Sequence, residues 1–290
     1  MTDRVDVPQD VATQVAAALR EDVGRGDVTA SLVPAEQRVR GEVVSREDAV
    51  ICGAPWVTET FRQLDAGIAL AWQVHDGESV HAGATVLRVQ GRARPVLTGE
   101  RTALNFLQLL SGTASAARRF VEAVAGTGCQ ILDTRKTLPG LRTAQKYAVR
   151  CGGARNHRIG LFDMILIKEN HIAAAGSLAA AITAARRLQP PLPVEAEVEN
   201  LAELEEALAA APDIIMLDDF TVTDLRAAVR RVRGAGAPVK LEASGSVSLQ
   251  TVRAIAETGV DYISVGGLTK HVRAVDLSMR LEFSATPPRT

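Results

Sequence analysis

Six hydrophobic runs in the second half of the chain, each ending in charged or small polar residues, predict a set of buried parallel strands. They occupy residues 129–136, 164–170, 194–200, 214–220, 239–245 and 262–267. Helix-like stretches follow five of them, and each interval is long enough for a strand, a loop and a crossover helix. Strands that alternate with helices indicate an α/β fold with a parallel sheet. We expect a small or incomplete β/α barrel of about six strands, with an open doubly wound sheet as the alternative.

The ends of these strands carry the candidate chemistry. In a parallel barrel all strands open at their C-terminal ends onto one mouth, where active sites are built. The residues brought towards that mouth are Asp133, Arg135, Lys136, Lys168, Glu169, Glu195, Glu197, Asp218, Asp219, Glu242 and Ser244. Charges of both signs at one mouth indicate an enzyme for a highly charged substrate.

The first 110 residues or so have a different pattern. Apolar positions at helical spacing predict a helix over 8–22, and short alternating runs with glycine turns predict strands between 38 and 90. A helix over 99–124 is expected to link this part to the barrel. We therefore divide the chain into an N-terminal domain, a barrel domain and a C-terminal segment that returns to the first domain and frays over its last residues. The three parts are residues 1–112, 113–275 and 276–290.

The strand at 194–200 is the most informative. Glu195, Glu197 and Glu199 alternate with small apolar residues, so three carboxylates share one face. In a barrel that face would point to the interior or the mouth; the alternative is an edge strand with a solvated face. Glu197 together with Asp218 is a plausible Mg²⁺ pair, because Mg²⁺ prefers a few carboxylates completed by water and phosphate oxygens.

Cations and small residues complete the candidate site. Arg135 and Lys136 follow the first strand, and His157 and Arg158 precede the strand that ends in Lys168. We interpret them as one binding cluster for carboxylate or phosphate, although a single Arg-Lys pair is commonly just exposed. The small residues that end the last two strands would let backbone N–H groups approach an anion, with a helix start adding a favourable dipole. Neither a dinucleotide-binding nor a P-loop fingerprint is present.

Composition and charge narrow the function classes. The chain has 290 residues, 47% hydrophobic and 23% charged, with a net charge of −1, which argues against a nucleic-acid surface. Three cysteines without short paired spacing indicate neither a disulfide framework nor a zinc site. There is no signal-peptide pattern, and no apolar run approaches the ~18–20 residues that span a bilayer. We expect a cytoplasmic protein that binds neither nucleic acid nor membrane.

Several motifs together resemble one enzyme family over most of the chain. They are LREDVGRGDVTAS (19–31), GERTALNFLQLLSG (99–112), the long block from DTRKT to KENH (133–171), EVEN (197–200), MLDDF (216–220), LEASGS (241–246) and SVGGLTKHV (264–272). The family is quinolinate phosphoribosyltransferase, also called carboxylating nicotinate-nucleotide pyrophosphorylase. The resemblance implies an N-terminal α+β sandwich domain and an open barrel. It also implies a Mg²⁺-dependent reaction of de novo NAD biosynthesis, in which quinolinate and 5-phosphoribosyl 1-diphosphate give nicotinate mononucleotide, diphosphate and CO₂.

The resemblance also assigns roles to residues. Quinolinate would be surrounded by Arg135, Lys136, His157, Arg158 and Lys168. Glu197 and Asp218 would hold Mg²⁺ and the ribose hydroxyls. The remaining substrate contacts would come from Thr134, Ser244, Gly245, Gly266 and Gly267, the last four cradling the 5′-phosphate. The expected catalytic residues are Lys136, Lys168, Glu197 and Asp218. The resemblance further implies a homodimer or larger homo-oligomer with shared sites, each completed by Arg101 of the neighbouring subunit.

Two departures from the family pattern and several rival functions bear on this interpretation. MLDDF stands where the family often has LDNF, and we expect the added carboxylate of Asp219 to face away from the site. Ala243 stands where a serine is common, which should be neutral if only the backbone matters there. The rivals are a nicotinate-type or molybdenum-transport-associated phosphoribosyltransferase, a non-catalytic protein built on a decayed enzyme, and a barrel enzyme for other phosphorylated sugars. The complete set of site residues disfavours all four.

Overall fold

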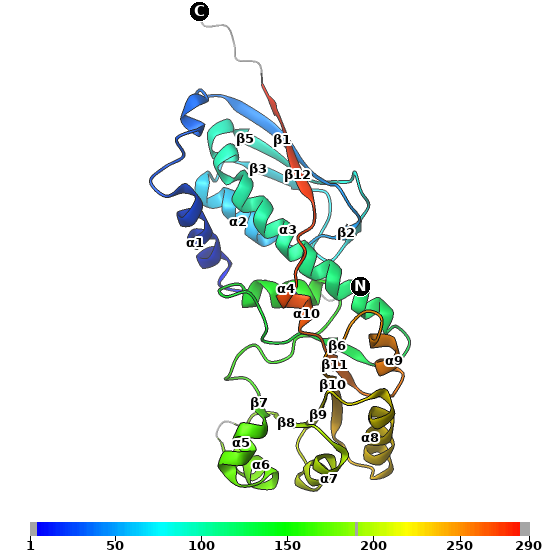
Figure 1. The fold of residues 1–290 in the computed structure, drawn as a ribbon. Coiled ribbons are helices and arrows are strands. Elements are labelled where there is room, and N and C mark those ends of the chain that lie inside the picture. The colour runs from blue at the N-terminus through cyan, green and yellow to red at the C-terminus, as the bar shows by residue number, and fades with distance from the viewer. Residues whose placement is uncertain (1–4, 189–190, 285–290) are drawn as a thin grey trace, which may run out of the picture. The chain divides into compact units, whose positions relative to one another are not determined.

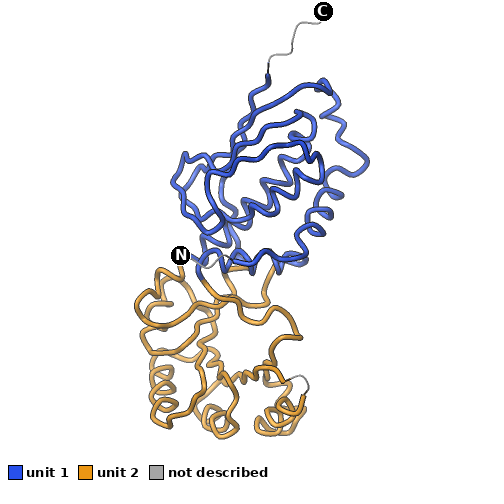
Figure 2. Tube along the Cα trace, turned by 180° about the vertical axis from the view of Figure 1, so that it is seen from behind, with its two compact units in different colours: residues 1–118, 138–153, 271–290 blue, residues 119–137, 154–270 orange. Residues whose placement is uncertain are grey.

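The computed structural model describes residues 5–188 and 191–284, and the chain forms two compact units (Figures 1 and 2). Unit 1 contains residues 1–118, 138–153 and 271–290, and unit 2 contains residues 119–137 and 154–270. The chain therefore leaves unit 1, returns to it for one helix and returns again at its end. The expected fraying of the last residues concerns positions that lie almost entirely outside the described part.

Unit 1 is an antiparallel sheet packed with helices. Its four strands run in the order β12-β1-β5-β3. Their bounds are β12 Leu277–Phe283, β1 Arg38–Ser45, β5 Thr85–Arg92 and β3 Ala69–Trp72. Alternate residues of β1 and β5 are buried, as expected for a sheet with one face on a core. A small second sheet pairs β2 (Ala49–Val50) with β4 (Ser79–Val80).

The helices of unit 1 supply the rest of its core. They are α1 (Val11–Val23), the 3-10 turn η1 (Ala30–Leu32), α2 (Ala54–Leu64), most of α3 (Ala93–Ala123) and α4 (Arg142–Cys151). The predicted stripe on α3 is confirmed, because Leu104, Leu107 and Leu110 are all buried. The helix begins at Ala93, earlier than the sequence pattern indicated, since the segment before Gly99 packs into the same core.

Helix α4 follows the first barrel strand in the sequence, yet it belongs to unit 1. Its Tyr147 lies 5.4 Å from Trp56 between ring centroids, and both share a hydrophobic cluster with Phe106 and Leu110. We expected a crossover helix of the barrel here. The helix itself is confirmed, but contacts with residues far away in the sequence decide where it packs. The domain boundaries drawn from the sequence stay a prediction.

Unit 2 holds the six predicted strands in one parallel sheet. The order is β6-β11-β10-β9-β8-β7. The strands are β6 Gln130–Leu132, β7 Ile165–Ile167, β8 Val194–Val198, β9 Ile214–Asp218, β10 Lys240–Ser244 and β11 Tyr262–Ser264. From β7 to β11 each strand lies beside the next in sequence, and β6 follows β11. This is the circular order of a barrel, whereas a doubly wound sheet reverses its order at a switch point.

The barrel is open between its first two strands. Among the described residues no strand ladder joins β6 to β7. Instead Arg155 forms a single parallel bridge with Leu132 of β6, so the chain from 154 onward follows the edge of that strand. The fold class predicted from the sequence, an α/β protein with an open barrel, is confirmed.

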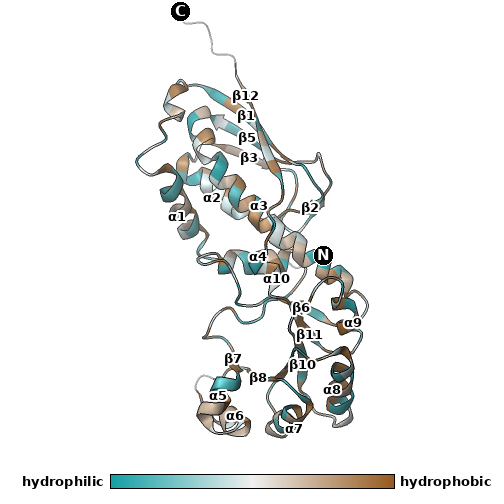
Figure 3. Ribbon diagram, viewed as in Figure 1, coloured by the Kyte–Doolittle hydropathy of each residue, from teal (hydrophilic) through white to brown (hydrophobic). Residues whose placement is uncertain are grey.

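The remaining helices of unit 2 connect or follow its strands (Figure 1). They are α5 (Glu169–Ala175), α6 (Leu178–Arg186), α7 (Leu201–Ala210), α8 (Val222–Gly234), α9 (Val252–Ala256) and α10 (Gly267–Lys270). Ser177, Asn200 and Thr221 accept backbone N–H bonds at the starts of α6, α7 and α8, which fixes where each helix begins. Figure 3 shows hydrophilic and hydrophobic residues interleaved along α8, as expected for a helix with one buried face. None of the helices in the described part of the chain combines the length and apolar composition needed to cross a bilayer.

Candidate active site

Strand β8 presents two carboxylates to the barrel interior. All five residues of the strand are buried, including Glu195 and Glu197. β8 is paired on both sides, with β7 and with β9, so the edge-strand alternative is wrong. The third glutamate, Glu199, lies beyond the strand end and is exposed. The alternation of the sequence thus produces an interior wall that carries negative charge.

Lys168, directly after β7, contacts Glu197 on the neighbouring strand β8. Lys168 is the residue after β7 and the N-cap of α5, and its Nζ donates to Glu197 Oε2. The lysine side chain is 42% exposed and that of the glutamate 7%. Asp218 ends β9, and the β8–β9 register pairs Val198 with Leu217, so Glu197 and Asp218 lie at the same end of neighbouring strands. The structure therefore brings the predicted lysine, glutamate and aspartate to one edge.

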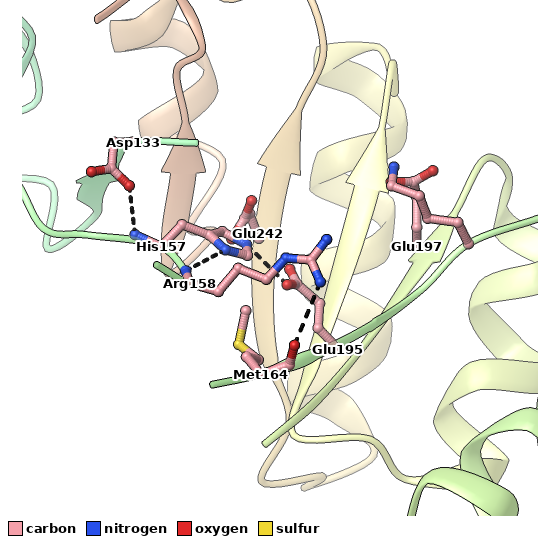
Figure 4. Close-up of polar contacts among 8 residues, drawn as sticks. Asp133, His157, Arg158, Met164, Glu195, Glu197 and Glu242 are labelled. Carbon is pink, nitrogen blue, oxygen red and sulfur yellow. Dashed lines mark hydrogen bonds and ion pairs between the residues drawn. The ribbon is translucent and has the colours of Figure 1, made fainter. Parts of the chain in front are cut away.

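His157 is held by its backbone and lies with its ring inside the barrel (Figure 4). Its backbone N–H donates to Asp133 Oδ1 at 2.9 Å, and Asn156 Nδ2 donates to Asp133 Oδ2 at 2.7 Å. The ring Nδ1 accepts the backbone N–H of Arg158 at 2.7 Å. A ring nitrogen that accepts a hydrogen bond carries no proton, so the neutral ring has its proton on Nε2. His157 therefore adds no positive charge to the site in this arrangement.

The Nε2 of His157 faces two buried glutamates. It lies 2.9 Å from Glu195 Oε2 and 3.6 Å from Glu242 Oε2, and both glutamates are fully buried. Burial raises the pKa of Glu195 to about 7, which the charge of Arg158 opposes. Burial together with the charge of Glu195 raises the pKa of Glu242 to about 8. Two carboxyl groups so close and so dry cannot both ionise cheaply, so they favour sharing a proton.

Arg158 and Arg135 form the positive side of the site. The pKa of Arg158 is lowered by burial and by the like charge of Arg135, and the carboxylate of Glu195 opposes this. The guanidinium Nη1 donates to the carbonyl of Met164 at 3.5 Å, and Figure 4 shows it extending over Glu195. Two guanidinium groups that repel each other in a half-buried place form a site that an anion with two carboxylates would stabilise.

Thr134 and Lys136, after β6, lie together with Gly266, after β11. Thr134 Oγ1 accepts the backbone N–H of Lys136 at 3.0 Å, and the Lys136 carbonyl accepts the hydroxyl of buried Thr269 at 2.7 Å. A Cβ on Gly266 would lie 3.1 Å from Lys136 Cδ. Because Gly266 has no side chain, the Lys136 side chain can pass close to its backbone. The hydrogen bond from Thr269 joins the loop after β6 to α10, which follows β11.

The end of β10 is a strained turn against the end of β9. Gly245 has φ +100°, and the next residue, Ser246, has φ +37°. Asp219, itself at φ +53°, donates its backbone N–H to the Ser244 carbonyl at 3.1 Å. A Cβ on Gly245 would lie 2.0 Å from Asp219 Oδ1. We expected Asp219 to face away from the site; its carboxylate is exposed and lies against Gly245, one of the predicted site glycines.

The structure also bears on the helix starts near the predicted phosphate site and on the position of Arg101. Among the described residues no helix begins directly after the Ser244–Gly245 turn, since α9 begins only at Val252, and α10 at Gly267 is four residues long. The helix dipole expected to favour an anion here is therefore absent or short. Arg101 is exposed on α3 and belongs to unit 1, whereas the other predicted site residues belong to unit 2.

Two groups of side chains in the described chain have the spacing of metal ligands. In one, the ligand atoms of His157, Glu195 and Glu242 lie within 4.8 Å of one another, and the other joins Cys52, Asp76 and Cys151 in unit 1. Asp76 already accepts hydrogen bonds from two backbone N–H groups and from the Tyr147 hydroxyl at 2.8 Å. The second group is therefore explained by the start of α2 that Asp76 caps.

Sequence reasoning assigned no role to the buried pair of glutamates. Glu195 and Glu242 were placed among the strand-end residues without a function, although each lies inside a run of apolar residues that predicts burial. A carboxylate within such a run is the signal that could have identified them, because a buried carboxylate requires a partner. Asp133, which accepts the backbone N–H of His157, was likewise placed at the mouth without a role.

The chain is similar to known proteins over both of its halves. Models described as the N-terminal and C-terminal domains of quinolinate phosphoribosyl transferase match residues 27–111 and 113–280. A nicotinate-nucleotide pyrophosphorylase (carboxylating) of Mycobacterium leprae is 46% identical over 273 residues, which cover 92% of this chain and 95% of the relative. A quinolinate phosphoribosyltransferase (decarboxylating) of Nicotiana tabacum is 37% identical over 296 residues, covering 94% and 83%. The solved structure of the Francisella tularensis nicotinate-nucleotide pyrophosphorylase matches with a TM-score of 0.90 and 46% identity, over 97% of this chain and 100% of that one.

Proposed function

Because the chain belongs to the quinolinate phosphoribosyltransferase family, we infer that its barrel site carries out the reaction for which its relatives are named. The enzyme transfers the phosphoribosyl group of 5-phosphoribosyl 1-diphosphate to quinolinate with loss of CO₂. The products are nicotinate mononucleotide and diphosphate, consistent with de novo NAD biosynthesis. The observation that best supports this function is the half-buried guanidinium of Arg158, near enough to the like-charged Arg135 to be affected by its charge, which suits a small dianion.

We propose that Arg135, Arg158 and Lys168 bind the two carboxylates of quinolinate. A guanidinium can hold a carboxylate through two parallel N–H bonds, and an ammonium adds a compact charge. His157 would contribute through the shape of its buried ring and through the Arg158 backbone that it holds, not through charge. Lys168 would divide its contacts between substrate and Glu197, because its side chain is still 42% exposed.

Glu197 and Asp218 are the proposed ligands of Mg²⁺ and of the ribose hydroxyls. Their carboxylates lie at the same end of neighbouring strands, and the half-buried Asp218 leaves room for water and substrate oxygens, which is the donor set that Mg²⁺ prefers. When bound, the ion would neutralise charge on the diphosphate. The two carboxylates would also stabilise the positive charge that develops at C1 of the ribose.

The 5′-phosphate would lie against the ends of β10 and β11. Gly245 and Gly266 present backbone without side chains there, between Ser244 and Gly267. Backbone N–H groups in such turns bind anions. Thr134 and Lys136, held to the same loop through Thr269, would close the cradle.

The chemistry needs no protein nucleophile. The pyridine nitrogen attacks C1 of the ribose, and the bond from C1 to the diphosphate oxygen breaks with its electrons on the diphosphate. Lys136 or Lys168 would neutralise that leaving group. The bond from the ring to the carboxylate beside the cationic nitrogen then breaks, CO₂ leaves, and the ring carbon takes a proton.

We propose a homodimer in which Arg101 enters the partner's site. Arg101 is exposed on α3, and it lies one turn from Thr98, whose hydroxyl donates to Asp27 at 2.9 Å. Asp27 also accepts two backbone N–H groups of its own loop, so hydrogen bonds join this loop to α3 one turn from Arg101. A cytoplasmic location stays a prediction from the sequence.

The first experiment measures CO₂ released from carboxyl-labelled quinolinate by the purified protein with 5-phosphoribosyl 1-diphosphate and Mg²⁺. A parallel reaction offers nicotinate. Donor-dependent CO₂ from quinolinate and no nucleotide from nicotinate is the expected result. Nucleotide from nicotinate alone would instead make the protein a phosphoribosyltransferase of the non-decarboxylating kind.

A further inference from the structure

Glu195 and Glu242 form a buried floor beneath the side chains that bind substrate. Both are fully buried, on β8 and β10, with β9 between them. An ionised carboxylate inside a protein is costly unless hydrogen bonds or an opposite charge compensate it. Two such groups at one place indicate that they have a function, because apolar residues of similar size would pack there at a lower cost in folding free energy.

His157 connects this floor to the backbone of Arg158. Its Nδ1 accepts the Arg158 N–H at 2.7 Å, so Nε2 carries the proton, and this nitrogen lies 2.9 Å from Glu195 Oε2. The ring is thus held at Nδ1 by a backbone donor, while Nε2 lies at ion-pair distance from the Glu195 carboxylate. The guanidinium of the same Arg158 extends over Glu195, whose charge favours its protonated form (Figure 4).

A buried metal ion is the competing explanation for this group of side chains. Their ligand atoms lie within 4.8 Å of one another, but a metal needs a ring nitrogen without a proton. With Nδ1 occupied by a backbone N–H, the proton resides on the very nitrogen that would have to bind the ion. The position of the ring proton therefore favours a histidine in close contact with two carboxyl groups over a metal site.

We propose that Glu195 and Glu242 are positioning residues for the quinolinate carboxylate. Both would hold the His157 ring by close contact, and through its Nδ1 the backbone of Arg158, while the charge of Glu195 acts on the guanidinium of that arginine. This inference rests on the proposed function. In this proposal Glu195 and Glu242 set the orientation of the Arg158 guanidinium, and a bidentate contact with a carboxylate depends on that orientation.

The test replaces both glutamates by methionine, which fills similar space without polar atoms. Removing buried charges in this way leaves a fold as stable or stabilises it, so a Tm equal to or above that of wild type is expected. The KM for quinolinate should rise at least about tenfold, while the KM for 5-phosphoribosyl 1-diphosphate stays within about twofold. Glu195→Gln, whose amide oxygen can still accept from His157 Nε2, should recover most of the affinity. Glu199→Met is the matched control, since Glu199 follows the same strand and is exposed.

Several outcomes would overturn the proposal. An unchanged KM for quinolinate in the double variant, or an equal rise for both substrates, removes the floor from carboxylate positioning. A fall in Tm of the double variant with unchanged kinetics makes the role structural. A metal ion found at one per chain in wild type and lost from the double variant replaces the proposed floor by a metal site. If wild type itself releases no CO₂ from quinolinate, the proposed function fails. An NMR measurement of the His157 ring protons still tests the positioning in that case, because the positioning predicts a proton on Nε2 in wild type.

Discussion

Replacing Gly245 by alanine tests the strained turn at the mouth of the barrel. At φ +100° an alanine is strained by about 1–2 kcal/mol. Its Cβ would also lie 2.0 Å from Asp219 Oδ1 and 2.9 Å from the Asp219 backbone nitrogen, and such overpacking adds about 1–3 kcal/mol. The sum is about 2–5 kcal/mol, which lowers Tm by about 4–10 °C for a protein of this size.

Gly176→Ala separates the two contributions to this loss. Gly176 also lies in unit 2, has φ +88° and has nothing within 4 Å of its Cβ position, so its alanine variant should lose only the strain, about 2–4 °C. Calorimetry of both variants measures the difference. Gly245→Ala should also raise the KM for 5-phosphoribosyl 1-diphosphate and not that for quinolinate. Equal losses of Tm in the two variants would refute the close contact with Asp219.

Further expected outcomes concern charge, assembly and pH. Arg158→Ala should raise the KM for quinolinate by about 10- to 150-fold, the value of one charge-assisted contact of about 1.5–3 kcal/mol, and a larger effect on the donor KM would remove it from the carboxylate site. Arg101→Ala and Lys168→Ala subunits, each inactive, should regain activity when mixed and allowed to exchange; no recovery would argue against a shared site. Burial raises the pKa of Glu242 to about 8 from an ordinary 4.5. Between these two pH values the folded state binds this proton and the unfolded state does not, so the free energy of unfolding should fall as pH rises from about 4.5 to about 8. Glu242→Gln should flatten that part of a Tm-against-pH curve, and an unchanged slope would show that other groups cause it.

The barrel could be predicted because its signals are local. Each of the six strands is a short apolar run that ends in charge, and the period of two on β8 correctly placed Glu195 and Glu197 on an interior face. Their alternation with helices predicted a parallel sheet, but it left the strand order open between a barrel and a doubly wound sheet. Parallel strands with their C-terminal ends together brought Lys168, Glu197 and Asp218 to one edge without any knowledge of distances.

What could not be predicted depends on contacts between distant segments. Tyr147 packs on Trp56, and no periodicity within α4 reveals that partner. His157 was expected to join the cations, but the direction of its nitrogens is decided by the Arg158 backbone and by Glu195. The left-handed conformation of Asp219, which turns its carboxylate to Gly245, likewise has no signature in an amphipathic pattern.

The pairing of β12 with β1 has a consequence for how the chain folds during synthesis. Val39 pairs with Phe283, so the last described strand completes the sheet that one of the first strands began. Until β12 has been translated, β1 has an unpaired edge on one side, and the whole barrel is translated in the meantime. An exposed strand edge is a template for pairing with other chains. Nascent chains stalled before residue 277 should therefore hold a folded barrel beside an incomplete first sheet, and deleting the final strand should cause aggregation of unit 1 rather than loss of the barrel.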